Sequence, residues 1–277
     1  MLFRTVALGS LLACAAACTE KSEPSRGSLR SMAQAPLAPL EGARDAGADD
    51  REPAFQLAPA PVFGEEPPSR ALRLALGART ARLGDEDFQL GSGESMQKLK
   101  AKLEAADGPK VLLSVQDDAF LAQAAPALEA LDDAGAQLWI QHPADPRATF
   151  PVLLRDEPSF QVWLDEPKLG KVRVVQRADG FELMTNIGKL PGADPNGPTV
   201  PVRGGQMDVA TLRRGLSRLK ERFSKADDAC LVPSFGTEVQ SVARALTGFW
   251  SAAGEPIFSK VCLVYPRPVA ARRDAGH

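Results

Sequence analysis

The sequence predicts an α+β fold in which two tandem β-β-α-β-α-β units, with helices on one sheet face, follow a disordered tether. Three observations predict this fold. The composition changes near residue 70, where Pro- and Ala-rich chain gives way to regularly spaced apolar residues. The order of strand and helix patterns over residues 70–145 returns over residues 171–267. In both units the second helix pattern stops at a Gly that precedes a last apolar run.

Residues 1–18 have the pattern of a bacterial lipoprotein signal peptide. Arg4 gives a positive start, and an uncharged apolar run follows. This run is shorter than the roughly 20 apolar residues that cross a bilayer. It ends at Cys18 behind small residues similar to a lipobox, and Cys14 stands in a second such sequence. We expect lipidation of Cys18, with Cys14 as the alternative. A signal cleaved without lipidation and a retained membrane anchor stay open.

Residues 19–69 are rich in Pro, Ala and charged residues, with almost no aromatic residue before Phe55. Such a segment cannot bury enough apolar area to offset the entropy lost on ordering. We therefore expect a disordered tether, which would hold the folded units away from the periplasmic face of a bacterial membrane. Residues 268–277 are expected to form a disordered tail.

The first unit covers residues 70–145, and its elements follow from apolar periodicity. Helix ends are marked by Asp107-Gly108 and by Gly135. The expected elements are, in order, strands over 71–78 and 80–90, a helix over 95–106, a strand over 111–115, a helix over 119–134 and a strand over 137–140.

Residues 146–170 connect the units, and 150–165 predict a hairpin with Asp156-Glu157-Pro158-Ser159 as its turn. The second unit, residues 171–267, repeats the first. Its expected elements are strands over 171–176 and 181–186, a helix from Asp208 to Phe223, a strand over 230–232, a helix over 238–253 and a strand over 260–265. In the best alignment Val111-Leu112-Leu113 lies on Cys230-Leu231-Val232. We expect the two copies to pack as a pseudo-dimer through the sheet faces that the helices leave open.

The second unit resembles the periplasmic domain of the ExbD/TolR biopolymer-transport family, and the first unit does so more faintly. The matching features are Val172–Gln176, the turn at Asp179-Gly180, the helix with Leu212, Leu216 and Leu219, Cys230–Pro233, Ala253-Gly254 and Val261–Tyr265. The resemblance implies a domain that dimerises and binds envelope proteins or peptidoglycan. Family members also carry a membrane helix with a proton-handling acidic residue, but residues 1–18 contain no Asp or Glu. The resemblance therefore implies a shared binding domain and not a shared motor.

The composition is poor in catalytic material. There are two His residues, His142 and His277, and His is the side chain on which general-base and metal chemistry most depend. A net charge of −2 gives no general attraction for nucleic acid. Asp117-Asp118 has no further cation ligands nearby, and Gly204-Gly205 belongs to no phosphate-binding motif. We predict no catalytic, cofactor-binding or metal-binding residue, and no cofactor.

Cys230 and Cys262 fall in the third and fourth strands of the second unit. Two strand cysteines in one small exported domain favour a structural disulfide. Two buried free thiols and a redox-active pair are the alternatives, although no Cys-x-x-Cys spacing is present.

One helix of the second unit carries a candidate partner-binding surface. Its basic residues are Arg213, Arg214, Arg218, Lys220 and Arg222. A solvated helix face and a contact with an acidic partner both explain such a run.

These observations together predict a non-enzymatic, lipid-anchored cell-envelope binding or scaffold protein. Its expected partner is an envelope protein or peptidoglycan. It is also expected to attach to the membrane through its lipid, and both a homodimer and a monomer stay open. Three alternatives stay open. They are a component of a biopolymer transport complex with a retained N-terminal anchor, a stand-alone periplasmic binding or sensory domain that resembles the family only by coincidence, and a periplasmic enzyme of unrecognised type.

Overall fold

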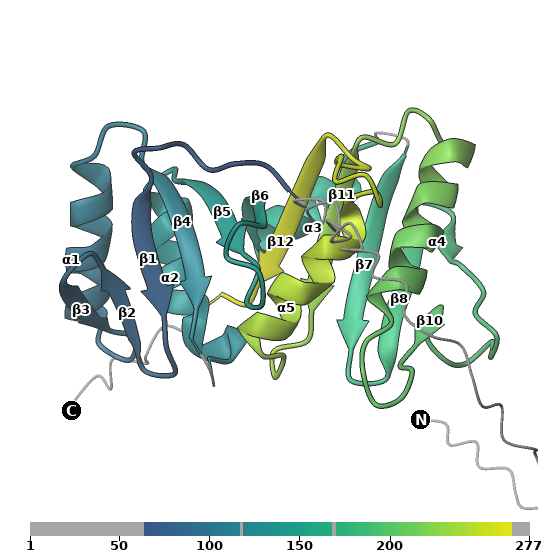
Figure 1. Ribbon diagram of the computed structural model, residues 1–277, viewed down its shortest axis with the longest axis horizontal. Helices are drawn as coiled ribbons and strands as arrows, with labels where there is room; N and C mark the ends of the chain where they lie inside the picture. Colours follow the sequence, from purple (N-terminus) through teal and green to yellow (C-terminus); the bar gives the residue numbers. More distant parts are fainter. Residues whose placement is uncertain (1–63, 117–118, 168–169, 268–277) are drawn as a thin grey trace, which may run out of the picture. The chain divides into compact units, whose positions relative to one another are not determined.

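The computed structural model describes residues 64–116, 119–167 and 170–267, and these form a mixed α/β structure (Figure 1). Cys14, Cys18, Asp117, Asp118 and the predicted tail lie outside the described residues. The strands are β1 Leu72–Leu76, β2 Thr80–Leu83, β3 Glu86–Gln89, β4 Lys110–Val115, β5 Gln137–Gln141, β6 Thr149–Asp156, β7 Lys171–Arg177, β8 Gly180–Thr185, β9 Gly188–Lys189, β10 Val200–Pro201, β11 Asp228–Pro233 and β12 Lys260–Tyr265. The helices are α1 Gly93–Glu104, α2 Leu121–Asp133, α3 Glu157–Asp165, α4 Val209–Arg222, α5 Val239–Leu246 and the 3₁₀ turn η1 Thr247–Phe249.

All of the described strands belong to one mixed sheet, and its order displays the internal repeat. The order is β10-β8-β7-β11-β12-β6-β5-β4-β1-β2-β3, with β9 paired to β8. In the first unit β4 runs parallel to β1 and β5, while β2 runs antiparallel to β1. In the second unit β11 runs parallel to β7 and β12, while β8 runs antiparallel to β7. The predicted mixed fold is confirmed, and the two units share one strand order.

The strand β6 joins the two units edge to edge. Its first half pairs antiparallel with β5, where Val152 is the partner of Leu138. Its second half pairs parallel with β12, where Leu153 is the partner of Cys262. The expectation that the copies pack through their open sheet faces is therefore wrong, because an intervening strand extends the sheet instead.

The predicted hairpin over 150–165 is also wrong, because this segment forms β6 followed by the helix α3. The side chain of Asp156 caps the helix by accepting a hydrogen bond from the Ser159 N–H (2.8 Å), and Pro158 lies in the first turn. An Asp cap with Pro in the first turn is a helix start as well as a turn signal.

A reciprocal contact links the starts of the two equivalent helices. The N–H of Leu121, the first residue of α2, donates to the Thr237 carbonyl (2.9 Å). The N–H of Val239, the first residue of α5, donates to the Ala119 carbonyl (2.8 Å). Each unit thus gives the other the same hydrogen bond, which is the pattern of a two-fold interface.

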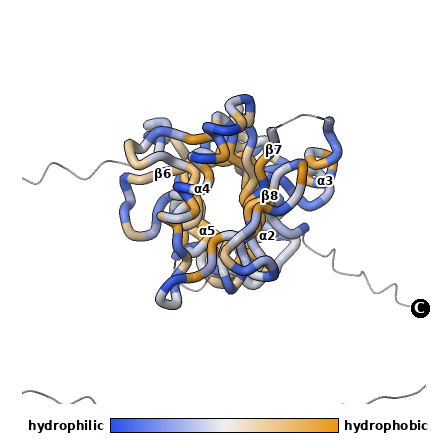
Figure 2. Tube along the Cα trace, turned by 90° about the vertical axis from the view of Figure 1, so that its right-hand side faces the viewer, coloured by the Kyte–Doolittle hydropathy of each residue, from blue (hydrophilic) through white to orange (hydrophobic). Residues whose placement is uncertain are grey.

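The main core lies between one sheet face and the four helices of the repeat, α1, α2, α4 and α5. Figure 2 shows hydrophobic segments around the middle of the molecule, between α4, α5 and the strands β7 and β8, with hydrophilic segments toward the outside. The helix α3 packs on the opposite face of the second unit, where Phe160 and Trp163 cover Cys230, Cys262 and Val264. The four repeated helices therefore lie on one face of the sheet, as predicted. In the second unit α3 also covers the opposite face.

Three element boundaries differ from those predicted. Residues 80–90 form two short strands that turn at Gly84, whose φ is +63°. The helix predicted over 238–253 ends at Leu246 and passes into η1. The predicted tether extends to residue 69, yet the Glu65 N–H donates to the Thr149 carbonyl (2.9 Å), and so residues 64–69 belong to the fold.

The predicted alignment of the two copies is one residue out of register. Val111 and Leu113 of β4 belong to the main core, as Ala229 and Leu231 of β11 do. Cys230 faces the other side of the sheet, and so its structural equivalent is Leu112 and not Val111. A slip of one residue moves every side chain to the other sheet face, and so the correction decides which residues face the core.

Candidate functional site

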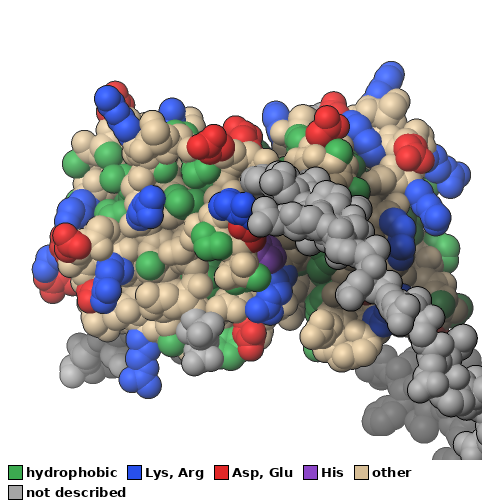
Figure 3. All heavy atoms as spheres, in the orientation of Figure 1, with side chains coloured by type: hydrophobic (Ala, Val, Ile, Leu, Met, Phe, Trp, Pro, Cys, Tyr) green, Lys and Arg blue, Asp and Glu red, His purple; other side chains and the backbone are tan. Residues whose placement is uncertain are grey.

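The basic residues of α4 fall into two groups: three are exposed along one line of the helix, and two form hydrogen bonds within the fold. Arg214, Arg218 and Arg222 are exposed and follow one another at a spacing of four residues, which places them in one line along the helix. Lys and Arg side chains gather over α4 at the right of Figure 3. Among the described residues, no carboxylate forms an ion pair with these three guanidinium groups. We call these three residues the basic ridge.

The other two basic residues of α4 are used by the fold. Arg213 donates to the Thr247 carbonyl (3.2 Å) and so links α4 to η1. Lys220 donates to the Ala226 carbonyl (2.8 Å) and pairs with Asp227 (2.7 Å). These contacts fasten the end of α4 to the loop before β11, and so only the ridge is available to a partner.

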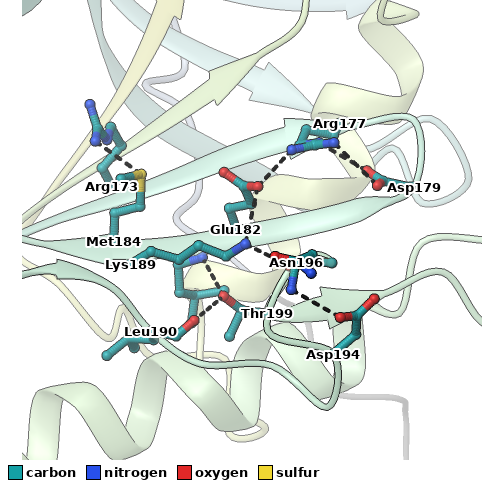
Figure 4. A network of polar contacts seen from close by, with 12 residues as sticks. Arg173, Arg177, Asp179, Glu182, Met184, Lys189, Leu190, Asp194, Asn196 and Thr199 are labelled. Carbon is teal, nitrogen blue, oxygen red and sulfur yellow. Dashed lines mark hydrogen bonds and ion pairs between the residues drawn. The ribbon is translucent and has the colours of Figure 1, made fainter. Parts of the chain in front are cut away.

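A second charged cluster holds the loop that follows β8 (Figure 4). Arg177 donates to Asp179 (3.0 Å) and to Glu182 (2.7 Å), so the guanidinium bridges the two carboxylates. Lys189 lies 3.5 Å from the same Glu182 and donates to the Gly197 carbonyl (2.6 Å). Because its charges pair internally and one cation reaches the loop backbone, this cluster is a structural clamp.

Gly204-Gly205 makes a tight turn. Arg203 and Gln206 exchange backbone hydrogen bonds across it (2.8 and 3.1 Å), and both glycines have positive φ, +58° and +76°. A two-residue turn of this kind needs residues that tolerate the left-handed region, which explains the Gly pair.

Cys230 and Cys262 are cross-strand partners on β11 and β12, and the structure joins them as a disulfide. Their Cα atoms are 4.4 Å apart, and both residues are buried beneath α3. A bond in this position ties the third and fourth strands of the second unit together. The first unit has Leu112 and Trp139 as the equivalent pair.

A cleft of about 740 Å³ lies at the seam between the units. Four consecutive residues of β6, Pro151–Leu154, line it. Residues of β5 and β12, which lie on opposite sides of β6 in the sheet, also line it, so the cleft spans β6. It lies where the pairing of β6 passes from β5 (Val152 with Leu138) to β12 (Leu153 with Cys262).

The walls of this cleft are mostly apolar, and its rim is charged. The apolar walls include Trp139, Leu153, Trp250, Pro256 and Phe258. The charged residues on the rim are Glu65, Asp132, Glu255 and Lys260. Three carboxylates against one ammonium group make the rim acidic. Sequence reasoning missed this cleft because it depends on a strand pairing between distant residues.

Trp139 contributes an unpaired hydrogen-bond donor to the cleft wall. The residue is 7% exposed, and its buried Nε1–H has no hydrogen-bond partner among the described residues. An unpaired buried donor costs roughly 1–3 kcal/mol. The fold therefore leaves this donor unsatisfied at the wall of the cleft.

Asp132 lies at the end of α2 and receives a hydrogen bond from the Tyr265 hydroxyl (2.9 Å). Burial raises the pKa of Asp132, and nearby Asp156 and Asp133 raise it further, while the Tyr265 bond acts in the opposite direction. Burial and the same carboxylate raise the pKa of Tyr265. The pair links the second helix of one unit to the last strand of the other.

His142 has a structural role at the end of β5. Its Nδ1 accepts hydrogen bonds from the N–H groups of Ala144 (3.2 Å) and Asp145 (3.1 Å). Burial and the charge of Arg244 lower the His142 pKa, which favours the neutral ring that can accept them. Within the described ranges, no group of His, Cys, Asp and Glu is arranged to hold a metal ion.

No protein-family model, curated protein or solved structure matches this chain. In the part of the chain that the structure describes, no helix is both long and apolar enough to cross a membrane.

Proposed function

We propose that the chain is a non-enzymatic, lipid-anchored binding or scaffold protein of the cell envelope, in which two ExbD/TolR-like units act as a fused dimer. The observation that carries the proposal is the reciprocal pair of hydrogen bonds between the starts of α2 and α5. Together with the matched strand orders, it supports a two-fold relation between the copies. A domain that dimerises between chains is here repeated within one chain, so a single tether carries both halves.

The Cys230–Cys262 bond supports a location in the cell envelope, outside the reducing cytoplasm. Structural disulfides form and persist in oxidising spaces such as the bacterial periplasm. The bond is buried under α3, where Phe160 and Trp163 pack against both cysteines. A lipid on Cys18, or on Cys14, would hold the tether at the membrane.

The anchor is tested by the intact mass of the full chain after expression in a Gram-negative host and extraction from membranes. The expected mass lacks residues 1–17 and includes acyl chains. A Cys18→Ala variant is expected to stay unprocessed, whereas the matched Cys14→Ala variant is processed normally. An unlipidated and uncleaved wild-type chain would refute the anchor and favour the transport-complex alternative.

Binding is tested by co-sedimentation of the same protein with purified peptidoglycan sacculi, which carry peptide carboxylates. The basic ridge is the surface proposed to meet them, because it presents three exposed guanidinium groups. Arg218→Glu is expected to weaken co-sedimentation, and more so at low salt. Arg79→Glu makes the same charge change at an exposed turn of the first unit and serves as the control. Equal binding by both variants would exclude the ridge.

A further inference from the structure

The cleft between the units has the volume and the lining that are usual for a small-molecule site. Its volume of about 740 Å³ lies within the roughly 300–1,000 Å³ that is usual for ligand pockets. Aromatic walls come from both units, with Trp139 from the first and Trp250 and Phe258 from the second. A ligand held there would therefore contact both copies at their joint.

The chemistry of the walls restricts the ligand. Apolar lining favours an apolar body, and the acidic rim disfavours an anion. The Nε1–H of Trp139 is buried and without a partner among the described residues, so it favours a ligand with a hydrogen-bond acceptor. Of the described side chains with a buried unpaired polar atom, Trp139 alone lines this cleft.

We infer that the cleft binds a neutral, largely apolar small molecule that carries one hydrogen-bond acceptor, with the Trp139 Nε1–H as its donor. The inference goes beyond the proposed envelope function and does not depend on it, because it uses only the residues of the seam. The mass measurement can refute the lipid anchor while the cleft still binds its ligand. Equally, the cleft can fail to bind while the chain is lipidated.

The test uses two neutral fluorescent probes and the full chain carrying Cys14→Ala and Cys18→Ala, purified without detergent. Prodan has a naphthalene body with a ketone acceptor, and N-phenyl-1-naphthylamine has a similar body without a carbonyl group. Prodan is expected to bind saturably with a blue-shifted emission. Trp139→Phe is expected to weaken prodan binding about 2- to 12-fold, the equivalent of one hydrogen bond, and to leave the other probe unchanged.

A second pair of variants keeps the test valid if Trp139→Phe fails to fold. Leu153 is 48% exposed and lines the cleft, whereas Val162 is 66% exposed on α3 and does not. Leu153→Glu is expected to weaken binding of both probes at least tenfold, and Val162→Glu is the control for the same charge change. Probe binding to residues outside the described part contributes equally to all variants.

Three results would overturn the inference. The absence of saturable prodan binding, or equal binding by the Leu153→Glu and Val162→Glu variants, would exclude the cleft as the site. An equal loss of both probes in Trp139→Phe would exclude the indole N–H as the donor.

Discussion

Removing the Cys230–Cys262 bond should lower the free energy of unfolding by an amount set by the loop that it closes. The two cysteines are separated by 32 residues, which corresponds to about 3–4 kcal/mol at 25 °C in the chain-entropy treatment. For a domain of this size such a loss lowers the melting temperature by roughly 6–16 °C. Both side chains are buried beneath α3, so the variant must replace them with apolar residues, and Cys230→Val with Cys262→Ala does so.

The assay is urea unfolding of the full chain with Cys14→Ala and Cys18→Ala, with and without reductant. The protein that retains both strand cysteines should lose stability when reductant is added, whereas the Cys230→Val, Cys262→Ala variant should not respond. Mass spectrometry after alkylation in urea counts the free thiols in each sample. Two free thiols in the unreduced protein, or equal stability with and without reductant, would refute the disulfide reasoning.

Three further predictions concern single side chains, each measured by urea unfolding. Burial raises the Asp132 pKa, so its contribution to stability is present below about pH 4, the usual range of an unfolded Asp, and is lost as pH rises through the raised value. Asp132→Asn, which can still accept from Tyr265, should therefore be relatively more stable at pH 7 than at pH 4, and a pH-independent difference would contradict this. Arg218→Glu replaces like-charge contacts along the basic ridge by opposite-charge ones and should stabilise the fold by about 1 kcal/mol at low salt; no gain would mean that the ridge charges do not interact. Asp208→Ala removes the α4 cap and should destabilise by about 1 kcal/mol, whereas Asp208→Asn should retain most of the stability.

The regular elements could be predicted because their signals are local. Leu212, Leu216 and Leu219 give a helical stripe, and all three are buried. The alternating leucines of β1 likewise identify a strand face, and Leu74 and Leu76 are fully buried. These patterns report burial on the same few turns of chain, so no distant contact is needed to interpret them.

The errors arose where one local signal has two structural meanings or where the contact is distant. Asp156 and Pro158 suit a turn and also a helix start, and packing of Phe160 and Trp163 against the buried cysteines selects the helix. The helix α5 ends early at a site where Gly248 lies against Leu212, too close for a β-carbon. The seam cleft could not be predicted, because it requires knowledge that β6 changes partners along its length.

The divided pairing of β6 has a consequence for biosynthesis. Leu153 finds its partner Cys262 only when the last strand has been made, more than 100 residues later in the chain. Until then the second half of β6 presents an unpaired strand edge, which is a template for aggregation. Pairing between such distant segments is also slow, because a long loop must close first. A chain of this design is therefore expected to need protection by a chaperone between synthesis and folding, and truncation before residue 260 should leave an aggregation-prone product.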